Sequence, residues 1–262
     1  MALISLTFDD GLASQLDYAI PTLQRHGLRG TFYLSVGNQG FGRRHEDWAA
    51  AAKAGHELAN HTIFHPGVSS KSSVTDGIAL ESYSLDRMHR ELVAANNVLR
   101  MLDGRDERTF AFPGSNPFLG RPGWPRRLLT RLGLERTRLM GAVDRYGIDF
   151  GSRLVDYTPI VRDLFLAARC GGTQASQLAK VPENRYGVRG VEGDGRTTEE
   201  LLDAVEAAIQ RDAWLVLVFH GIGESGPLVC DRAIFKDLIA HLAGDRRVRV
   251  LTFIDAAKQT WT

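Results

Sequence analysis

The most constraining feature of this chain is the segment 4–11 (ISLTFDDG), an apolar run that ends in two adjacent aspartates and a glycine. Such a run is typical of a strand covered on both faces, and in α/β barrels catalytic residues follow the C-terminal ends of such strands. Successive strand residues point to opposite sides, so Asp9 and Asp10 can serve one site only if the backbone turns there, which Gly11 permits. Alternatively, one aspartate caps the next helix and the other is solvated.

The length and composition favour one large α/β domain that covers residues 1–262. A chain of 262 residues with 44% hydrophobic content can bury a large core, and two smaller domains are the alternative. The formal net charge is +1, and the basic residues are scattered among acidic ones, so we expect neither nucleic acid nor a membrane as a partner. The oligomeric state stays open, with a homo-oligomer as one option.

The sequence shows neither a secretory signal segment nor an apolar stretch that approaches the ~18 residues of a membrane span. We therefore expect a cytoplasmic protein. The two cysteines, Cys170 and Cys230, do not make a disulfide framework, and we expect both to be reduced packing residues.

Strand-like runs alternate with helical patterns along the chain, which indicates a parallel sheet with crossover helices. We expect strands at residues 4–8, 30–35, 56–61, 109–112, 138–143, 153–161, 186–191, 214–219 and 248–253. We expect helices at residues 17–26, 46–54, 81–102, 126–132, 198–211 and 233–242. Seven or eight such units favour a (β/α) barrel, and an open doubly wound sheet is the rival fold.

Chemically active side chains follow several of these strands. The two aspartates follow the first strand, His61 ends the third, Pro113 and Gly114 follow the fourth, and His220 follows the apolar strand 214–219. A parallel barrel would gather these groups at one mouth.

The segment 60–66 (NHTIFHP) contains two histidines four residues apart. This spacing puts two imidazoles on one side of a helical turn, as divalent metal sites require, although such pairs also arise by chance. Pro66 disfavours an α conformation at His65, so the pair is expected on a loop with one turn. Two imidazoles and one carboxylate leave positions open for water and substrate, which is typical of a catalytic zinc site.

Four segments in this order resemble the motifs of the polysaccharide deacetylases, carbohydrate esterase family 4, also called the NodB-homology domain. The segments TFDDG (7–11) and NHTIFHP (60–66) resemble the first two motifs. The segments FAFPG (110–114) and LVFH (217–220) resemble the third and the last. The resemblance spans most of the chain and implies an irregular or incomplete (β/α) barrel of about seven parallel strands.

The resemblance also implies catalytic roles. Asp9 would be the general base and His220 the general acid. The N–H of Gly114, just after the third-motif proline, would help to hold the oxyanion, and Pro113 would shape the substrate groove.

The metal site carries over in the same way. Asp10, His61 and His65 would bind one divalent metal ion, expected to be Zn²⁺, with Co²⁺ or Ni²⁺ as alternatives. The metal ion and Asp9 would activate a water molecule for attack on an amide.

The sequence departs from the family pattern in two motifs. Ala111 stands where the third motif usually has an arginine that orients the base aspartate, and Arg108 lies three positions early. The fourth motif is not recognisable, and Asp194 and Glu192 are the best-placed substitutes, with Asp194 the candidate to support His220.

These observations predict a metal-dependent hydrolase that removes N-acetyl groups from an amino-sugar oligosaccharide or polysaccharide. One alternative is a hydrolase of a small non-sugar amide or ureide, as in allantoinase-like relatives. Another is a non-catalytic carbohydrate-binding protein. Trp124 could stack on sugars, although packing is the default role for this side chain.

Overall fold

The computed structural model describes residues 1–68, 78–134, 137–146, 148–223 and 228–261. Its strands are β1 (Ala2–Asp9), β2 (Thr31–Leu34), β3 (Glu57–Asn60), β4 (Thr109–Ala111), β5 (Phe118–Leu119), β6 (Val155–Asp156), β7 (Ala167–Cys170), β8 (Val188–Arg189), β9 (Val191–Glu192), β10 (Trp214–Phe219), β11 (Gly221–Gly223), β12 (Val229–Asp231) and β13 (Val248–Val250).

The α-helices are α1 (Ile20–Arg25), α2 (Gln39–Arg43), α3 (His45–Lys53), α4 (Leu85–Asp103), α5 (Trp124–Arg131), α6 (Arg138–Tyr146), α7 (Thr158–Leu164), α8 (Thr198–Arg211), α9 (Arg232–Gly244) and α10 (Phe253–Trp261). A π-helical turn, Gln15–Ala19, precedes α1, and short 3₁₀ turns lie at Leu80–Ser82, Pro113–Ser115 and Ala175–Gln177.

The main sheet is parallel and nearly closes into a barrel. Its strand order is β8-β7-β4-β3-β2-β1-β10-β9, and β13 pairs with the start of β1. The two ends of this order are consecutive in the chain, because only Gly190 separates β8, which pairs with β7, from β9, which pairs with β10. The predicted incomplete barrel of about seven parallel strands is therefore confirmed, and the rival open sheet is wrong.

Glycine is needed where β8 passes into β9. A Cβ atom on Gly190 would lie 2.4 Å from Cγ2 of Val218 on β10. The backbone at this point therefore packs directly against its neighbour, which brings the two sides of the barrel together.

The alternation of side chains along β1 explains why polar groups reach the barrel interior. Ile4, Leu6 and Phe8 pack outward into the largest hydrophobic cluster, beneath the surrounding helices. Thr7 points inward and donates a hydrogen bond to the carbonyl of Leu217 at 2.8 Å. Asp9, two residues later, therefore also faces the interior.

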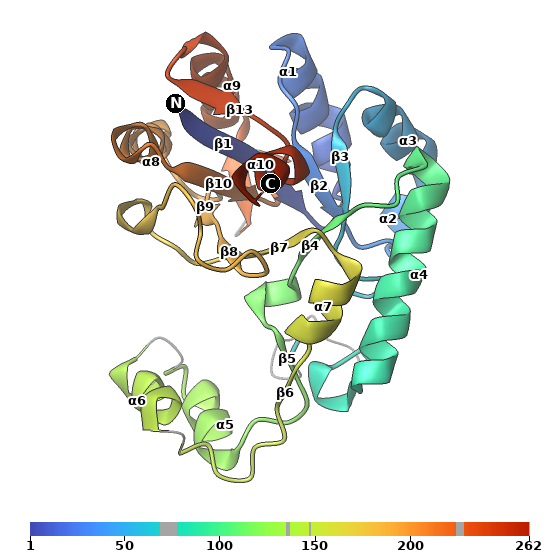
Figure 1. Ribbon diagram of the computed structural model, residues 1–262, viewed down its shortest axis with the longest axis vertical. Coiled ribbons are helices and arrows are strands. Elements are labelled where there is room, and N and C mark those ends of the chain that lie inside the picture. The colour runs from blue at the N-terminus through green and yellow to red at the C-terminus, as the bar shows by residue number, and fades with distance from the viewer. Residues whose placement is uncertain (69–77, 135–136, 147, 224–227, 262) are drawn as a thin grey trace.

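Helix α10 covers the N-terminal end of the barrel, and Figure 1 shows it across the centre of the sheet. Its first N–H groups are held by buried side chains, since Phe253 donates to Oγ1 of Thr31 at 2.7 Å and Ile254 donates to Oε2 of Glu57 at 2.9 Å. Burial raises the pKa of Glu57. This end of the barrel is closed, which leaves the C-terminal strand ends as the mouth.

Several sequence predictions of secondary structure hold. The apolar strand at 214–219 and the helix at 198–211 have the expected bounds. The side chain of Thr197 accepts from the N–H of Glu200, and the side chain of Glu200 accepts from the N–H of Thr197, which forms a capping box.

Four strand predictions need correction. Residues 138–143 form part of α6 because Met140 and Val143 bury one face of a helix. The run 153–161 holds only the short β6 before α7, the run 186–191 is interrupted at Gly190, and the run 248–253 ends early because Phe253 begins α10. The sequence reading also missed β7, a four-residue Ala-Ala-Arg-Cys strand.

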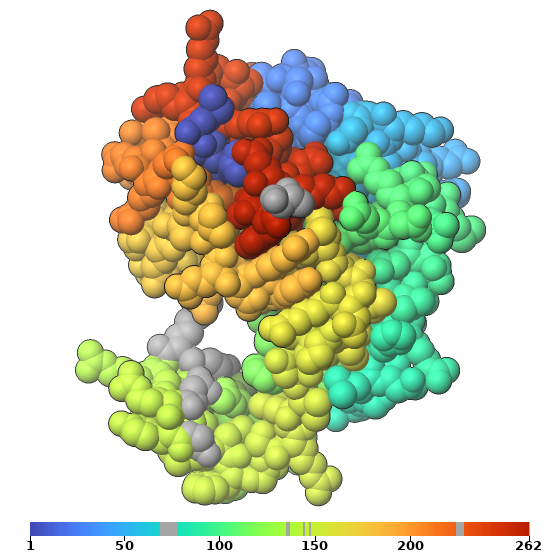
Figure 2. All heavy atoms as spheres, in the orientation of Figure 1, coloured from blue at the N-terminus to red at the C-terminus, as the bar shows by residue number. Residues whose placement is uncertain are grey.

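A helical hairpin, defined here as residues 120–154, joins β5 to β6 and contains α5 and α6. The antiparallel pair of β5 and β6 forms its neck. Figures 1 and 2 show that the hairpin projects from the barrel wall. Among the described residues, no helix combines the length and apolar character needed to cross a membrane.

Candidate active site

The mouth of the barrel collects side chains from four strands. Asp9 ends β1, His61 follows β3, Arg169 lies on β7 and His220 follows β10. Each occupies an inward position of its strand, so the parallel register brings them together. The alternation of inward and outward side chains along each strand therefore assembles the site.

Asp10 joins this group through an unusual backbone turn. Asp10 and Gly11 both have left-handed conformations, with φ of 75° and 70°. The turn directs the Asp10 carboxylate back toward the mouth, whereas a continued strand would point it outward. Both carboxylates therefore face one site, as the sequence reading required.

Asp10, His61 and His65 form a compact group of possible metal ligands. Oδ1 of Asp10 lies 3.6 Å from Nε2 of His61 and 3.5 Å from Nε2 of His65. Two ligands bound at about 2.1 Å in a tetrahedral zinc site lie about 3.4 Å apart. The donor types and spacing thus fit one divalent metal ion of the zinc class.

The position of His61 suits a metal ligand. Its Nδ1 lies 2.8 Å from the carbonyl oxygen of Ala111, so Nδ1 carries the proton and Nε2 faces Asp10 and His65. Burial, with a smaller contribution from the neighbouring His65, lowers the pKa of His61 to about 4, although the charges of Asp9 and Asp10 oppose this shift. The imidazole is therefore neutral at pH 7, which is the form that binds a metal.

The loop that carries His65 is held from α4. Oε1 of Glu91 accepts hydrogen bonds from the N–H groups of Ile63 and Phe64, at 3.1 and 3.0 Å. Oε2 of Glu91 accepts a third from the hydroxyl of Tyr83 at 2.9 Å. His65 itself adopts a left-handed conformation with φ of 49°. A fixed carboxylate on α4 thus sets the path of the chain between the two histidines.

Asp9 is paired with an arginine that the sequence reading did not identify. Nη2 of Arg169 donates to both carboxylate oxygens of Asp9, with 2.5 Å to Oδ2, and both side chains are buried. Burial would raise the pKa of Asp9, but the charge of Arg169, with those of His61 and His220, lowers it overall. Asp9 is therefore ionised at neutral pH.

The candidate arginine named from sequence lies elsewhere. Arg108 is buried and donates to both oxygens of Asp103 and to the carbonyl of Leu58. Its position before β4 places it at the closed end of the barrel. Arg108 therefore does not support Asp9.

His220 is held by Asp194. Its Nδ1 lies 2.6 Å from Oδ2 of Asp194, and its backbone N–H donates to Oδ1 at 3.2 Å. Burial would lower the pKa of His220, but the hydrogen bond to Asp194 and the charges of Asp9 and Asp194 raise it to about 9. Nε2 lies 3.9 Å from Oδ2 of Asp9. Glu192, the other substitute named from sequence, also lies close, and burial raises its pKa.

Gln15 links the two strands that carry Asp9 and His220. Its Nε2 donates to the backbone carbonyls of both residues, and the side chain is fully buried. No sequence motif marked this glutamine. Its position in the helical turn after Gly11, at the mouth of the barrel, was the available signal.

Pro113 and Gly114 lie just after β4 in a 3₁₀ turn. Pro113 is buried, while Gly114 is exposed and left-handed with φ of 57°. The next residue, Ser115, accepts a hydrogen bond at 2.7 Å from the N–H of Gly171, which follows β7. This contact ties the third-motif turn to the strand that carries Arg169.

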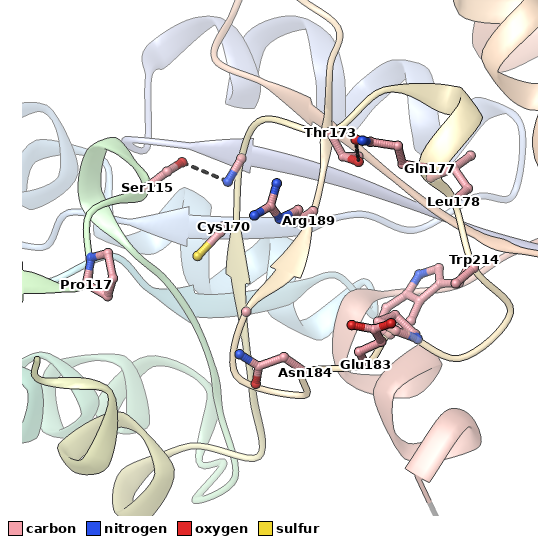
Figure 3. A pocket seen from close by; sticks show the side chains of 14 residues that line it. Ser115, Pro117, Cys170, Thr173, Gln177, Leu178, Glu183, Asn184, Arg189 and Trp214 are labelled. Carbon is pink, nitrogen blue, oxygen red and sulfur yellow. Dashed lines mark hydrogen bonds between the residues drawn. The ribbon is translucent and has the colours of Figure 1, made fainter. Parts of the chain in front are cut away.

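A cavity of about 800 Å³ is lined by residues of β7 and β8 and of the segment between them (Figure 3). Cys170 and Arg189 line it, and Cys170 points away from the barrel interior because it follows the inward Arg169. Ser115 and Gly171, which are joined by a hydrogen bond, also line it. Pro117, which follows the third-motif turn, also lines this cavity, whereas Trp124, the residue that could stack on sugars, begins α5.

Comparison with known proteins agrees with these motifs. Residues 2–130, about half of the chain, match the model of the polysaccharide deacetylase family. Over 97 residues the chain is 36% identical to a chitin deacetylase of Arthroderma benhamiae, a match that covers 36% of this chain and 25% of that relative. The chain thus spans about a quarter of the length of this curated relative.

Solved structures share the fold at low sequence identity. A putative polysaccharide deacetylase from Mycobacterium smegmatis superposes with a TM-score of 0.62 at 14% identity, over 98% of this chain and 89% of that one. A family 4 acetyl xylan esterase from Clostridium thermocellum, in complex with a cobalt ion, gives a TM-score of 0.51 at 16% identity, over 98% and 91%. With the family match and the shared barrel, the chain belongs to the polysaccharide deacetylase family.

Proposed function

We propose that this protein is a metal-dependent hydrolase that removes N-acetyl groups from an amino-sugar oligosaccharide or polysaccharide. The observation that carries the proposal is the arrangement of the mouth, where three metal-type ligands lie beside an ionised aspartate and a protonated histidine. The chitin deacetylase similarity supports the amino-sugar substrate.

The metal site would use Asp10, His61 and His65. Their spacing fits a tetrahedral ion, with further positions left for water and substrate. A bound Zn²⁺ would supply Lewis-acid polarisation of the acyl oxygen and would lower the pKa of a bound water to about 7. Co²⁺ or Ni²⁺ would serve the same ligand set.

Asp9 would act as the general base. The hydrogen bonds from Nη2 of Arg169 to both oxygens fix the carboxylate, and the charge of Arg169 keeps it ionised, so that it can take a proton from the attacking water. Oδ2 also lies 3.9 Å from Nε2 of His61, which places the base beside the metal ligands.

His220 would act as the general acid. Its raised pKa keeps the imidazole protonated at neutral pH, and Nε2 faces the side of Asp9. It would donate this proton to the departing amine, which otherwise leaves as an unstable anion. Asp194 would orient the ring and stabilise the charged form, because it holds Nδ1 at 2.6 Å.

The backbone N–H of Gly114 would stabilise the oxyanion that forms on the acyl oxygen. Pro113 would shape the adjoining groove, since it is buried at the start of the same turn. With these roles, water attacks the amide directly, and the mechanism requires no serine or cysteine nucleophile.

Acetate release tests the proposal. The purified chain, loaded with Zn²⁺, Co²⁺ or Ni²⁺, is offered N-acetylglucosamine oligomers and an N-acetylated peptidoglycan fragment, with allantoin as the non-sugar amide. We expect acetate from an amino-sugar substrate and none after treatment with a chelator. Cleavage of allantoin without acetate release would contradict the substrate class, and full activity without metal would contradict the mechanism.

A further inference from the structure

The helical hairpin, residues 120–154, carries a positive charge that the composition of the whole chain conceals. It contains eight arginines, three acidic residues and no lysine, whereas the complete chain has a net charge of only +1. The arginines are Arg121, Arg126, Arg127, Arg131, Arg136, Arg138, Arg145 and Arg153, and the acidic residues are Glu135, Asp144 and Asp149.

Most of this charge is presented to solvent. Arg126 pairs with Asp149 at 3.3 Å, which anchors α5 to the return segment. Six of the other arginines are exposed, and none of the six forms an ion pair within the part of the chain that the structure describes. They are Arg121, Arg127, Arg131, Arg138, Arg145 and Arg153.

The same hairpin exposes large apolar side chains at helical spacing. Trp124, Leu128 and Leu132 follow one another at intervals of four along and just beyond α5, with exposed fractions of 57%, 49% and 60%. Leu139 and Tyr146 lie seven residues apart on α6, with exposed fractions of 59% and 70%. Each helix therefore has an apolar stripe in water.

These stripes are separate from the contact that holds the hairpin together. Met140 and Val143 are the buried apolar residues of α6, with 7% and 4% exposed. The hairpin projects from the barrel (Figures 1 and 2), so the barrel does not cover the exposed stripes. The hairpin surface combines exposed arginines with two apolar stripes. A binding partner that matches it must be both anionic and apolar.

We infer that the helical hairpin binds the surface of an anionic lipid bilayer. The six exposed arginines would contact lipid phosphates, and the apolar stripes would enter the boundary between headgroups and acyl chains. This charge complementarity is local, and for that reason the net charge of the chain did not indicate it. The inference concerns the hairpin alone and does not depend on the proposed hydrolase activity.

Two other occupants fit less well. A hydrated anionic polysaccharide would pair with the arginines and stack on Trp124, but it would leave Leu128 and Leu132 in water. A second copy related by a twofold axis would bring two hairpins of the same positive charge against each other. An anionic bilayer would both bury the leucines and pair with the arginines.

Vesicle flotation with the full chain tests the inference. The vesicles contain phosphatidylcholine, either alone or with about 30% phosphatidylglycerol. We expect binding to the anionic vesicles that weakens at least about tenfold on neutral vesicles or when salt rises from about 0.05 to about 0.5 M. A shift of Trp124 fluorescence to shorter wavelength should accompany binding.

Paired variants separate the two parts of the surface. Leu128→Ser with Leu132→Ser, and separately Arg127→Gln with Arg131→Gln, should each weaken vesicle binding at least about tenfold. Met101→Ser, at an 86% exposed site on α4, is the matched control and should bind as wild type. Circular dichroism confirms that each variant is folded.

Several results would overturn the inference. One is failure of the wild type to float with anionic vesicles at low salt. Another is an equal loss in Met101→Ser. Self-association in sedimentation velocity that the leucine variant abolishes, with vesicle binding unchanged, would instead identify a second copy as the occupant. Retention on an anionic polysaccharide that the leucine variant weakens, without vesicle binding, would do the same for a glycan.

Discussion

Asp9 and Asp10 are neighbours in sequence but are held by different partners. Asp9 is buried against Arg169, whereas Asp10 reaches His61 and His65 through a left-handed turn. The pattern of strand, two acids and glycine allowed both to face one site, and the resemblance to the deacetylase motifs implied separate roles for them. It could not predict the arginine, because Arg169 is 160 positions from Asp9 and lies within a short strand with almost no apolar signal.

The Arg169→Lys variant tests the support of Asp9. A lysine keeps the positive charge but loses the rigid planar guanidinium that holds Nη2 against both oxygens, so the base becomes misplaced. We expect kcat to fall about 10²-fold while metal binding stays unchanged. Arg108→Lys is the matched control, because it alters another buried arginine–aspartate pair far from the mouth. Its folded fraction should turn over as wild type, and an equal loss in both variants would contradict a local role for Arg169.

The Asp194→Asn variant tests the partner of His220. Loss of the carboxylate removes the charge and hydrogen bond that raise the pKa of His220, so its pKa should fall. Because the general acid must be protonated, the alkaline limb of kcat/KM should move to lower pH. An unchanged limb with lower kcat would show that another group supplies the proton.

The raised pKa of His220 also makes the free energy of unfolding depend on pH. The pKa of His220 rises from 6.5 to about 9 on folding, so its stabilising contribution is fully present below about pH 6.5 and is lost as pH rises through about 9. In metal-free protein, Asp194→Asn should therefore lower the free energy of unfolding more at pH 6 than at pH 10. Urea titrations at the two pH values measure this difference.

At the scale of elements, one short segment, β8 to β9, closes the barrel because it pairs with a strand on each side. β8 pairs with β7 and β9 pairs with β10, and the change takes place at Gly190. The sequence predicted a strand over this region, but not the interruption, because the reason for the glycine is the approach of Val218 from a distant strand. In contrast, α8 was predicted to the residue, because its capping box is local.

The Gly190→Ala variant tests this closure. An added Cβ would overlap the Val218 side chain, so we expect a loss of about 1–3 kcal/mol in the free energy of unfolding. Gly141→Ala is the control, since its Cβ would meet nothing within 4 Å and it lies inside α6. That change should stabilise the helix by up to about 1 kcal/mol. Chemical denaturation compares the two, and a neutral effect at Gly190 would show that the wall can adapt.

At the scale of the whole molecule, the sequence predicted the barrel because strand and helix patterns alternate and because four motifs follow strands in order. One error lies between β4 and β7, where residues 138–143 were predicted as a strand and belong to α6. The helical hairpin there projects from the barrel (Figure 1), and some of its large apolar side chains are exposed, so its hydrophobic pattern does not come from a buried core alone. Averaging charge over the chain likewise concealed the arginines of the hairpin.

The central claim is that two adjacent aspartates divide the work, Asp10 holding a metal ion and Asp9 moving a proton. Metal content and acetate release, measured together on folded wild type, Asp10→Ala and Asp9→Asn, test it most directly. The account predicts about one Zn²⁺ per chain in wild type and Asp9→Asn, none in Asp10→Ala, and acetate release by wild type alone. Metal retained by Asp10→Ala, or turnover retained by Asp9→Asn, would contradict it.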